Sequence, residues 1–324
     1  MLTLTKEEWR RRKEERREKQ RAANVGRAAK MHKLRIEGRF PSQRDIASLP
    51  RSTFEHHVGC SGWFYWKWRG PFYPERLPTR DWFSYYAEHF ETVEINASFY
   101  SWPTEASVKA WLRAAGRRRF IYTVKVCELI THVKRFKGTK TQVQDFGVIA
   151  DILGPRMGCF LFQLPPSFHY TQARLRAILD QLDHSHRNVV EFRHVSWWNE
   201  TVFNAFRGTG TIFCSCSAPR LPDVLIRTAD DIYVRFHGTQ RWYRHDYAGD
   251  ELQGWAARIK ESGAKTAWVY FNNDFGAHAP KNARELDLLL KSGPPEEAER
   301  PIDGHSIADE ATAASMLSSP DQRN

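Results

Sequence analysis

The sequence lacks any long apolar run. No stretch of about 18 residues is apolar enough to span a membrane, and no apolar signal region follows the first residues. The amino-terminal segment also mixes Glu with Arg too freely for a typical transit peptide. These absences argue against membrane-spanning and secreted classes, so we expect no membrane partner.

Cysteine is scarce as well. The five cysteines are odd in number and widely spaced, which is not the pattern of a disulfide framework. Cys60, Cys159 and Cys214 lie in or beside expected strands, where a small buried thiol is the usual finding. We therefore expect a reducing, cytoplasmic location. The close pair Cys214 and Cys216 is too small a set for a metal site, and a role for it beyond packing stays open.

The metal-binding spacing HExxH is also missing, and none of the expected strand ends carries an HxH pair. We predict no cofactor on this basis. His and carboxylate residues at several expected strand ends nevertheless leave a bound divalent metal open.

Charge is abundant but uneven along the 324 residues. Lys and Arg outnumber Asp and Glu by 49 to 38, a net charge of +11. Residues 1–51 hold 16 basic and 7 acidic residues, a net of +9, and residues 293–324 hold 2 against 7, a net of −5. We predict a basic arm over 1–51 that is helical or partly disordered, one folded domain over 52–292, and a disordered acidic tail over 293–324.

Eight short stretches alternate apolar and polar residues, as strands do. In the clearest of them, Val190 and Phe192 fall on one face, and Glu191 and Arg193 fall on the other. Most of these stretches place a polar side chain at the carboxyl end. The expected strands are Val58–Ser61, Val93–Asn96, Tyr122–Lys125, Phe160–Gln163, Val189–Arg193, Thr211–Cys214, Tyr233–His237 and Val269–Asn272.

Segments with helical spacing of apolar residues separate these strands. They cover residues 82–90, 108–115, 146–153, 175–182, 202–206, 252–259 and 286–290. Alternating strands and helices favour a parallel sheet, and eight pairs of them predict a closed (β/α)8 TIM barrel of the α/β class. In such a barrel the functional site lies at the carboxyl ends of the strands.

Several motifs resemble one known family. They occur in order over about residues 56–292, and they resemble the domain of unknown function 72 family, the YecE-like TIM-barrel proteins. The resemblance implies the same barrel fold and names no reaction. One departure is Cys214–Ser217, where relatives often carry an acidic residue. The motifs are Gly59–Trp63, Val93–Pro103, Lys125 with Thr131 and His132, Phe162–Phe168, Glu191–Arg193 with Ser196 and Trp197, Tyr233–Gly238, and Tyr270–Asn273 with Asn282 and Ala283.

The polar residues at the strand ends are the candidate site. We expect Glu94, Glu191, His237 and Lys125 to carry any catalysis, with the carboxylates as an acid and base pair. Arg193, Arg235 and Lys125 would clamp an anion, and Trp197 or Trp63 would stack on a ring. The full set of expected ligand-binding residues is Asn96, Tyr100, His132, Gln163, Arg193, Trp197, Arg235, Asn272, Asn273 and Trp63.

Three functions remain open from the sequence. The first is binding or hydrolysis of a small anionic or sugar-like molecule, such as a phosphosugar, nucleotide or glycoside. The second is a metal-dependent phosphodiesterase like the endonuclease IV barrels, with ligands drawn from Glu94, His132, Glu191, His237 and Asp274. The third is a non-catalytic protein that contacts nucleic acid through the basic arm. Whether the protein is an enzyme stays open, and if it is one we expect a hydrolase.

Two loops extend the candidate site. Residues 59–74 hold seven aromatics among sixteen residues, which favours either a packed lid or a wall for a ring-shaped ligand. Residues 238–249 interleave Arg with aromatic residues after the seventh strand, where phosphate sites are frequent in barrels.

Overall fold

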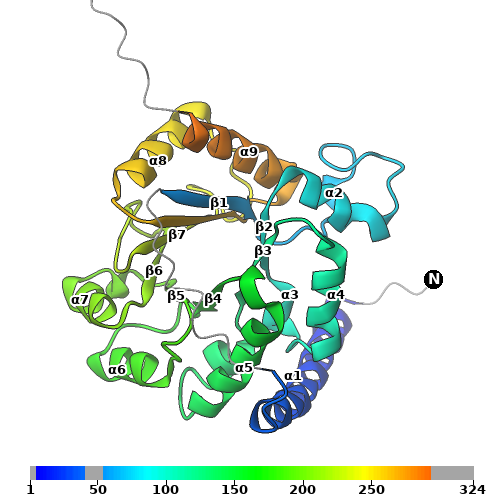
Figure 1. The fold of residues 1–324 in the computed structure, drawn as a ribbon, viewed down its shortest axis with the longest axis vertical. Coiled ribbons are helices and arrows are strands. Elements are labelled where there is room, and N and C mark those ends of the chain that lie inside the picture. The colour runs from blue at the N-terminus through cyan, green and yellow to red at the C-terminus, as the bar shows by residue number, and fades with distance from the viewer. Residues whose placement is uncertain (1–4, 41–53, 293–324) are drawn as a thin grey trace, which may run out of the picture. The chain divides into compact units, whose positions relative to one another are not determined.

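A computed structural model describes residues 5–40 and 54–292. Over these ranges the protein is a closed barrel of eight parallel strands in the order β1 to β8, with β1 pairing to both β2 and β8 (Figure 1). The predicted TIM barrel is therefore confirmed. The acidic tail expected over 293–324 lies outside the described residues.

All eight predicted strands are present, with shifts of a few residues at their ends. Each has one row of side chains in the barrel and the other against the surrounding helices, which explains the alternation in the sequence. The strands are β1 (Glu55–Cys60), β2 (Thr92–Ile95), β3 (Ile121–Lys125), β4 (Met157–Gln163), β5 (Asn188–Glu191), β6 (Ile212–Ser217), β7 (Asp231–Phe236) and β8 (Thr266–Phe271).

The helices form the outer layer around the strands (Figure 1). The seven predicted ones are found, most of them longer than the apolar spacing alone indicates. A short helix α3 (Ala97–Tyr100) directly follows β2 and was not predicted. The others are α2 (Trp82–His89), α4 (Glu105–Ala115), α5 (Lys140–Leu153), α6 (Gln172–Gln181), α7 (Glu200–Thr209), α8 (Gly249–Glu261) and α9 (His278–Lys291).

The basic arm contains one long helix, α1 (Lys6–Ile36), which starts at a capping box between Thr5 and Glu8. Its first half is exposed, but the second half packs against α5 (Figure 1). Asn24 is fully buried there: its amide donates to the Tyr100 carbonyl at 3.0 Å and its Oδ1 accepts from the Trp102 N–H at 2.9 Å. This half of the helix is therefore docked, and buried polar side chains contribute to its attachment.

Ion pairs add to this attachment. Arg35 Nε donates to Asp145 Oδ1 at 2.7 Å, and His32 Nδ1 lies 3.0 Å from the same oxygen. Ala28 and Met31 supply the small apolar contact. The helix is thus part of the same compact body as the barrel.

The aromatic segment after β1 is largely a packed lid. Trp68 and Tyr73 are fully buried, and Tyr73 stacks on Trp82 of α2 at 4.6 Å between ring centroids. The exceptions are Phe64 and Trp66, which remain exposed. Most of the unusual aromatic density therefore serves packing. Among the described helices, none combines the length and apolarity needed to cross a membrane.

Candidate ligand-binding site at the carboxyl face of the barrel

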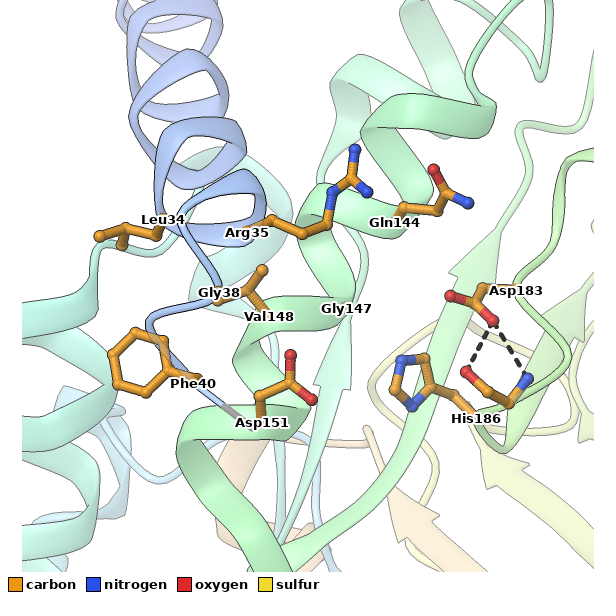
Figure 2. Close-up of a pocket in the computed structure, with 11 residues that line it drawn as sticks. Leu34, Arg35, Gly38, Phe40, Gln144, Gly147, Val148, Asp151, Asp183 and His186 are labelled. Carbon is orange, nitrogen blue, oxygen red and sulfur yellow. Dashed lines mark hydrogen bonds between the residues drawn. The ribbon is translucent and has the colours of Figure 1, made fainter. Parts of the chain in front are cut away.

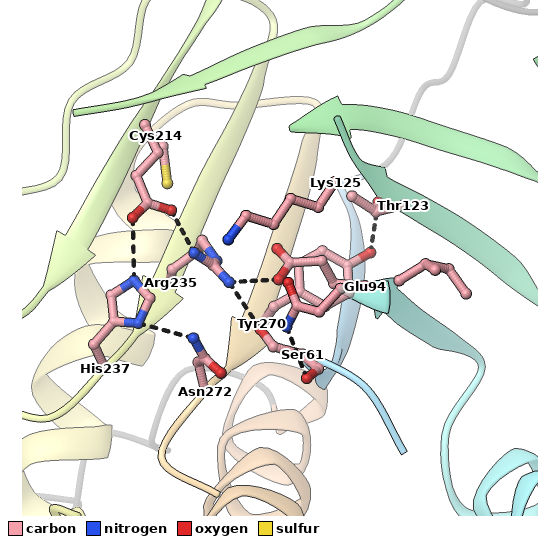
Figure 3. Close-up of polar contacts among 12 residues, drawn as sticks. Ser61, Glu94, Thr123, Lys125, Cys214, Arg235, His237, Tyr270 and Asn272 are labelled. Atoms are coloured by element: carbon pink, nitrogen blue, oxygen red, sulfur yellow. Dashed lines mark hydrogen bonds and ion pairs between the residues drawn. The ribbon is translucent and has the colours of Figure 1, made fainter. Parts of the chain in front are cut away.

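The centre of the site is a fully buried arginine between two carboxylates. Arg235 on β7 donates from Nη2 to Glu94 Oε1 at 2.6 Å and from Nη1 to Glu191 Oε2 at 2.5 Å (Figure 3). All three side chains have no exposed surface. The guanidinium group of Arg235 lies between the two carboxylates and forms an ion pair with each of them.

Glu94 is held at its second oxygen by Tyr233, whose hydroxyl donates to Oε2 at 2.5 Å. Arg235 Nη2 also lies 3.3 Å from the hydroxyl of Ser61 at the end of β1. With both oxygens engaged and no exposed surface, Glu94 has a structural place in the barrel interior.

Glu191 has a second arginine partner. Arg193 donates from Nε to Glu191 Oε1, and its Nη2 lies 3.2 Å from Nε2 of His237. Burial opposes ionisation of Glu191, but Arg193 and Arg235 outweigh it and hold the pKa of this carboxyl well below its ordinary value. Glu191 is therefore an anion near neutral pH and a poor general acid.

His237 is fully buried, and its Nε2 lies next to both Arg193 and Glu191. Its Nδ1 is 3.2 Å from the side-chain nitrogen of Asn272 (Figure 3). Burial, together with Arg193 and Arg235, moves the pKa of His237 well below its ordinary value. The imidazole is therefore neutral near pH 7, which suits a hydrogen-bonding role better than the expected proton exchange.

Lys125 ends β3 and points toward Arg235 (Figure 3). It is half-buried, and its ammonium nitrogen lies 4.4 Å from the centre of the Phe99 ring. Its Nζ makes no hydrogen bond or ion pair among the described residues. Burial, followed by the neighbouring Arg235, lowers the pKa of Lys125 to about 7.

A cavity of about 600 Å³ opens beside this network, over the carboxyl ends of β4 to β7. Arg193 reaches it from the buried network, and the Arg193 guanidinium carbon lies 4.4 Å from the centre of the Trp242 ring. The size fits a small metabolite. The lining residues are Gln163, Pro166, Arg193, His194, Val195, Pro219, Arg220, Trp242 and Tyr243.

Three other predicted residues surround the network, and of these Gln163 lines the cavity whereas Asn96 and His132 do not. Asn96 donates to the Ser61 carbonyl at 2.9 Å. His132 lies in a π-helical turn, Leu129–Val133, and burial with Lys125 nearby lowers its pKa to about 4. Gln163 donates from Nε2 to the Leu164 carbonyl and is the predicted amide that lines the cavity.

Four predicted ligand contacts lie elsewhere. Trp197 is fully buried and stacks on Phe192 at 4.0 Å, so it has no free face. Trp63 packs edge-on against Phe83, Asn273 is fully buried and donates to the His245 carbonyl, and Tyr100 is exposed at the end of α3. Packing therefore occupies Trp197, Trp63 and Asn273, whereas Tyr100 is exposed and does not line the cavity.

Trp242 and Tyr243 come from the loop 238–249 that the sequence indicated, whereas Tyr233, His194 and Arg220 were not predicted. Trp242 and Tyr243 belong to the loop after β7, whose mixture of Arg and aromatic residues was the available signal. Tyr233 sits two residues before Arg235 and therefore on the same inner face, where strand alternation could have indicated it.

One group of side chains has the donor types of a metal site. Glu191, Cys216 and His237 bring potential ligand atoms within 4.8 Å of one another. Their surroundings do not suit a cation, because Glu191 is paired with Arg193 and Arg235 and Arg193 Nη2 already faces His237 Nε2. Of the ligands expected for a phosphodiesterase, Glu94, His132 and Asp274 are not part of this group.

A second cavity, of about 720 Å³, lies between the end of α1, α5 and the segment after α6 (Figure 2). Arg35, Asp151, Asp183 and His186 supply its charged and polar lining. It draws no residue from the carboxyl ends of the strands, where barrel sites form. The smaller cavity is therefore the better candidate.

Comparison with known proteins points to one family. The sequence model of the family described as "Protein of unknown function DUF72" matches residues 57–303. UPF0759 protein YunF of Bacillus subtilis strain 168 is 26% identical over 270 residues, covering 72% of this chain and 94% of that protein.

Solved structures agree with this similarity. A DUF72 family protein from Thermotoga maritima MSB8 is 28% identical with a TM-score of 0.67, covering 74% of this chain and 100% of that one. A DUF72 family protein from Enterococcus faecalis V583 is 18% identical with a TM-score of 0.62, covering 74% and 96%. At the lower identity the likeness concerns the fold alone.

Proposed function

The chain belongs to the DUF72 family of TIM barrels, and from that premise we propose that it binds a small anionic, sugar-like ligand in the cavity over β4 to β7. Membership provides the barrel and assigns no reaction. The chemical class of ligand is inferred from the side chains that line the cavity.

The observation that carries the proposal is the position of Arg193. Two of its three guanidinium nitrogens are engaged, by Glu191 and His237, while Nη1 has no partner among the described residues. Only 9% of the side chain is exposed, and it borders the cavity. A guanidinium group fixed in this way is suited to a phosphate or carboxylate, because little conformational entropy is lost on binding.

The rest of the lining supports a polyol or ring on the same ligand. Trp242 and Tyr243 offer aromatic surface beside Arg193, and Gln163 offers an amide for hydroxyl groups. Arg220 and His194 add polar groups to the lining. A phosphosugar or nucleotide presents this combination of anion, hydroxyls and ring.

Hydrolysis of a glycoside receives less support than binding. Such a reaction needs two carboxyl groups facing the scissile bond, one of them protonated. Here Glu94 and Glu191 are both fully buried and share Arg235 between them. The carboxylates are better suited to holding Arg235 and Arg193 in place than to touching a substrate.

A thermal-shift and calorimetric titration with glucose 6-phosphate, ribose 5-phosphate, AMP and inorganic phosphate tests the proposal. We expect at least one phosphorylated ligand to bind the wild type and Arg193→Gln to weaken that binding at least tenfold. The matched control is Arg187→Gln, since Arg187 pairs with Asp231 at 2.9 Å at the opposite end of the strands. Equal affinity of both variants and the wild type would refute the role of Arg193.

A second candidate function rests on the exposed first half of α1. Residues 6–19 hold eight Lys and Arg and five Glu, a net charge of +3, and the side chains described from Glu7 to Arg17 are exposed. Such a surface supports weak, salt-dependent contact with nucleic acid. It is independent of the cavity and is tested separately.

A further inference from the structure

Lys125 stands apart from the other charged residues of the site. Glu94, Glu191, Arg193 and Arg235 are all linked by hydrogen bonds. The Lys125 ammonium nitrogen, by contrast, has neither a carboxylate nor a hydrogen-bonding partner among the described residues, and no dashed line reaches it in Figure 3. It lies 4.4 Å from the centre of the Phe99 ring. A lysine placed only to neutralise a carboxylate would be bonded to it.

The charge of the cluster is balanced without Lys125. The two carboxylates, Glu94 and Glu191, are matched by two guanidinium groups, Arg193 and Arg235. A protonated Lys125 would add an unpaired positive charge to a desolvated region that already contains both arginines. The neutral amine is therefore favoured, and a neutral amine has the free electron pair that a nucleophile needs.

The lowered pKa of Lys125 agrees with this balance. Desolvation is the main cause, and the positive charges of Arg235 and Arg193 act in the same direction, so the pKa falls to about 7. The carboxylates oppose the shift without cancelling it. The groups that act on Lys125 from the surrounding elements are Glu94 on β2, Glu191 and Arg193 at the end of β5, and Arg235 on β7.

We propose that Lys125 forms an imine with the carbonyl carbon of an anionic aldehyde or ketone whose anionic group is held by Arg193. The proposal rests on the function proposed above and narrows its ligand class to carbonyl compounds such as keto acids and sugar phosphates in their open form. Lys125 as a residue is partly buried, and Arg193 is among the charged groups near enough to act on its amine.

The chemical step is balanced by the two reactants alone. The nitrogen electron pair of Lys125 attacks the carbonyl carbon, and one N–H proton moves to the carbonyl oxygen to give a carbinolamine. The C–O bond then breaks, and the oxygen leaves as water with the second N–H proton. Nothing is oxidised or reduced, and no cofactor is needed.

Borohydride trapping tests the proposal on the full-length protein. Pyruvate and dihydroxyacetone phosphate are added separately at neutral pH, sodium borohydride reduces any imine to a stable secondary amine, and peptide mass spectrometry locates the adduct. We expect the adduct at Lys125 at least tenfold above that at the exposed Lys109, and its loss from Lys125→Arg. Equal labelling of Lys125 and Lys109 would overturn the proposal.

A second measurement needs no variant and no natural ligand. Reductive methylation with formaldehyde and cyanoborohydride is followed from pH 6 to 11, with the exposed Lys109 as the reference amine, and we expect Lys125 to reach half its maximal reactivity near pH 7. Half-maximal reactivity of Lys125 near pH 10 would overturn the proposal.

The two levels of the hypothesis fail differently. Dihydroxyacetone phosphate could raise the melting temperature in an Arg193-dependent way and yet give no adduct after borohydride treatment. That result would overturn imine formation at Lys125 and leave the anion site at Arg193 standing. If Arg193→Gln leaves the adduct at Lys125 unchanged, Lys125 is still the nucleophile. The claim that Arg193 selects the substrate would then be overturned. Absence of both shift and adduct across the carbonyl probes would overturn the imine proposal.

Discussion

Arg235 and Glu191 form a 2.5 Å hydrogen-bonded ion pair in which neither side chain has any exposed surface. Such a pair is expensive to desolvate and is not in itself an efficient way to stabilise a barrel interior. Glu191 also binds Arg193, which borders the cavity. The buried pair therefore fixes the carboxylate that holds Arg193 at the edge of the cavity, as the proposed anion site requires.

Replacement of Arg235 by Met should destabilise the protein strongly. Glu94 and Glu191 would be left buried without their common partner, and removing one member of a buried ion pair costs about 3–5 kcal/mol of unfolding free energy. Urea denaturation measures the change. Tyr233→Phe is the control, since it removes one hydrogen bond to Glu94, and should cost less. A change below about 1 kcal/mol for Arg235→Met would contradict the buried network.

Stability should depend on pH through Lys125. The pKa of Lys125 in the folded protein, about 7, is below its unfolded value of about 10.4, so the unfolded state binds more protons between these values. The free energy that the folded protein loses through a protonated Lys125 is present in full below pH 7, and it disappears as the pH rises toward 10. Lys125→Met should therefore raise the melting temperature most at pH 7 and below, and the difference from wild type should shrink by pH 10.

Melting curves of the wild type, Lys125→Met and Lys109→Met between pH 6 and 10 provide the measurement. The exposed Lys109 pairs with Glu105, and its replacement should shift the curve nearly in parallel with the wild type. Parallel curves for Lys125→Met would show that Lys125 does not lose its proton in this range.

Asn24→Ala should loosen the attachment of α1. It would leave the Tyr100 carbonyl and the Trp102 N–H without their side-chain partner in a buried position, at a cost of about 1–3 kcal/mol. Hydrogen exchange over residues 20–36 should accelerate while exchange in the strands changes less. The exposed Val25→Ala is the control, and equal protection in both variants would contradict the docking role of Asn24.

Nucleic-acid binding through the arm should depend on its exposed basic residues. Replacing Arg10, Arg11, Arg12 and Lys13 together by Gln should weaken binding to a fluorescent oligonucleotide and reduce its salt dependence. This change is preferable to deletion of residues 1–51, which would also uncover the surface that Asn24 and Met31 cover. Unchanged affinity would show that the arm does not bind nucleic acid.

The sequence by itself determined the barrel and the face of each strand that lines it. Strand alternation is a local property of extended backbone, so Glu94, Glu191, Arg235 and His237 could be assigned to the inner face without tertiary information. Parallel strands then bring their carboxyl ends to one edge, which predicted a polar mouth before any contact was known.

Only the tertiary structure decided how these residues are used. Pairing depends on distances between strands that are remote in sequence. Those distances join Arg235 to both carboxylates and leave Lys125 without a partner in the part of the chain that the structure describes. Packing likewise buries Trp197 and places Trp242 at the cavity, although both are tryptophans in loops after strands. Burial and charge pairing are properties of the whole fold, and they separate the structural carboxylates from the groups available to a ligand.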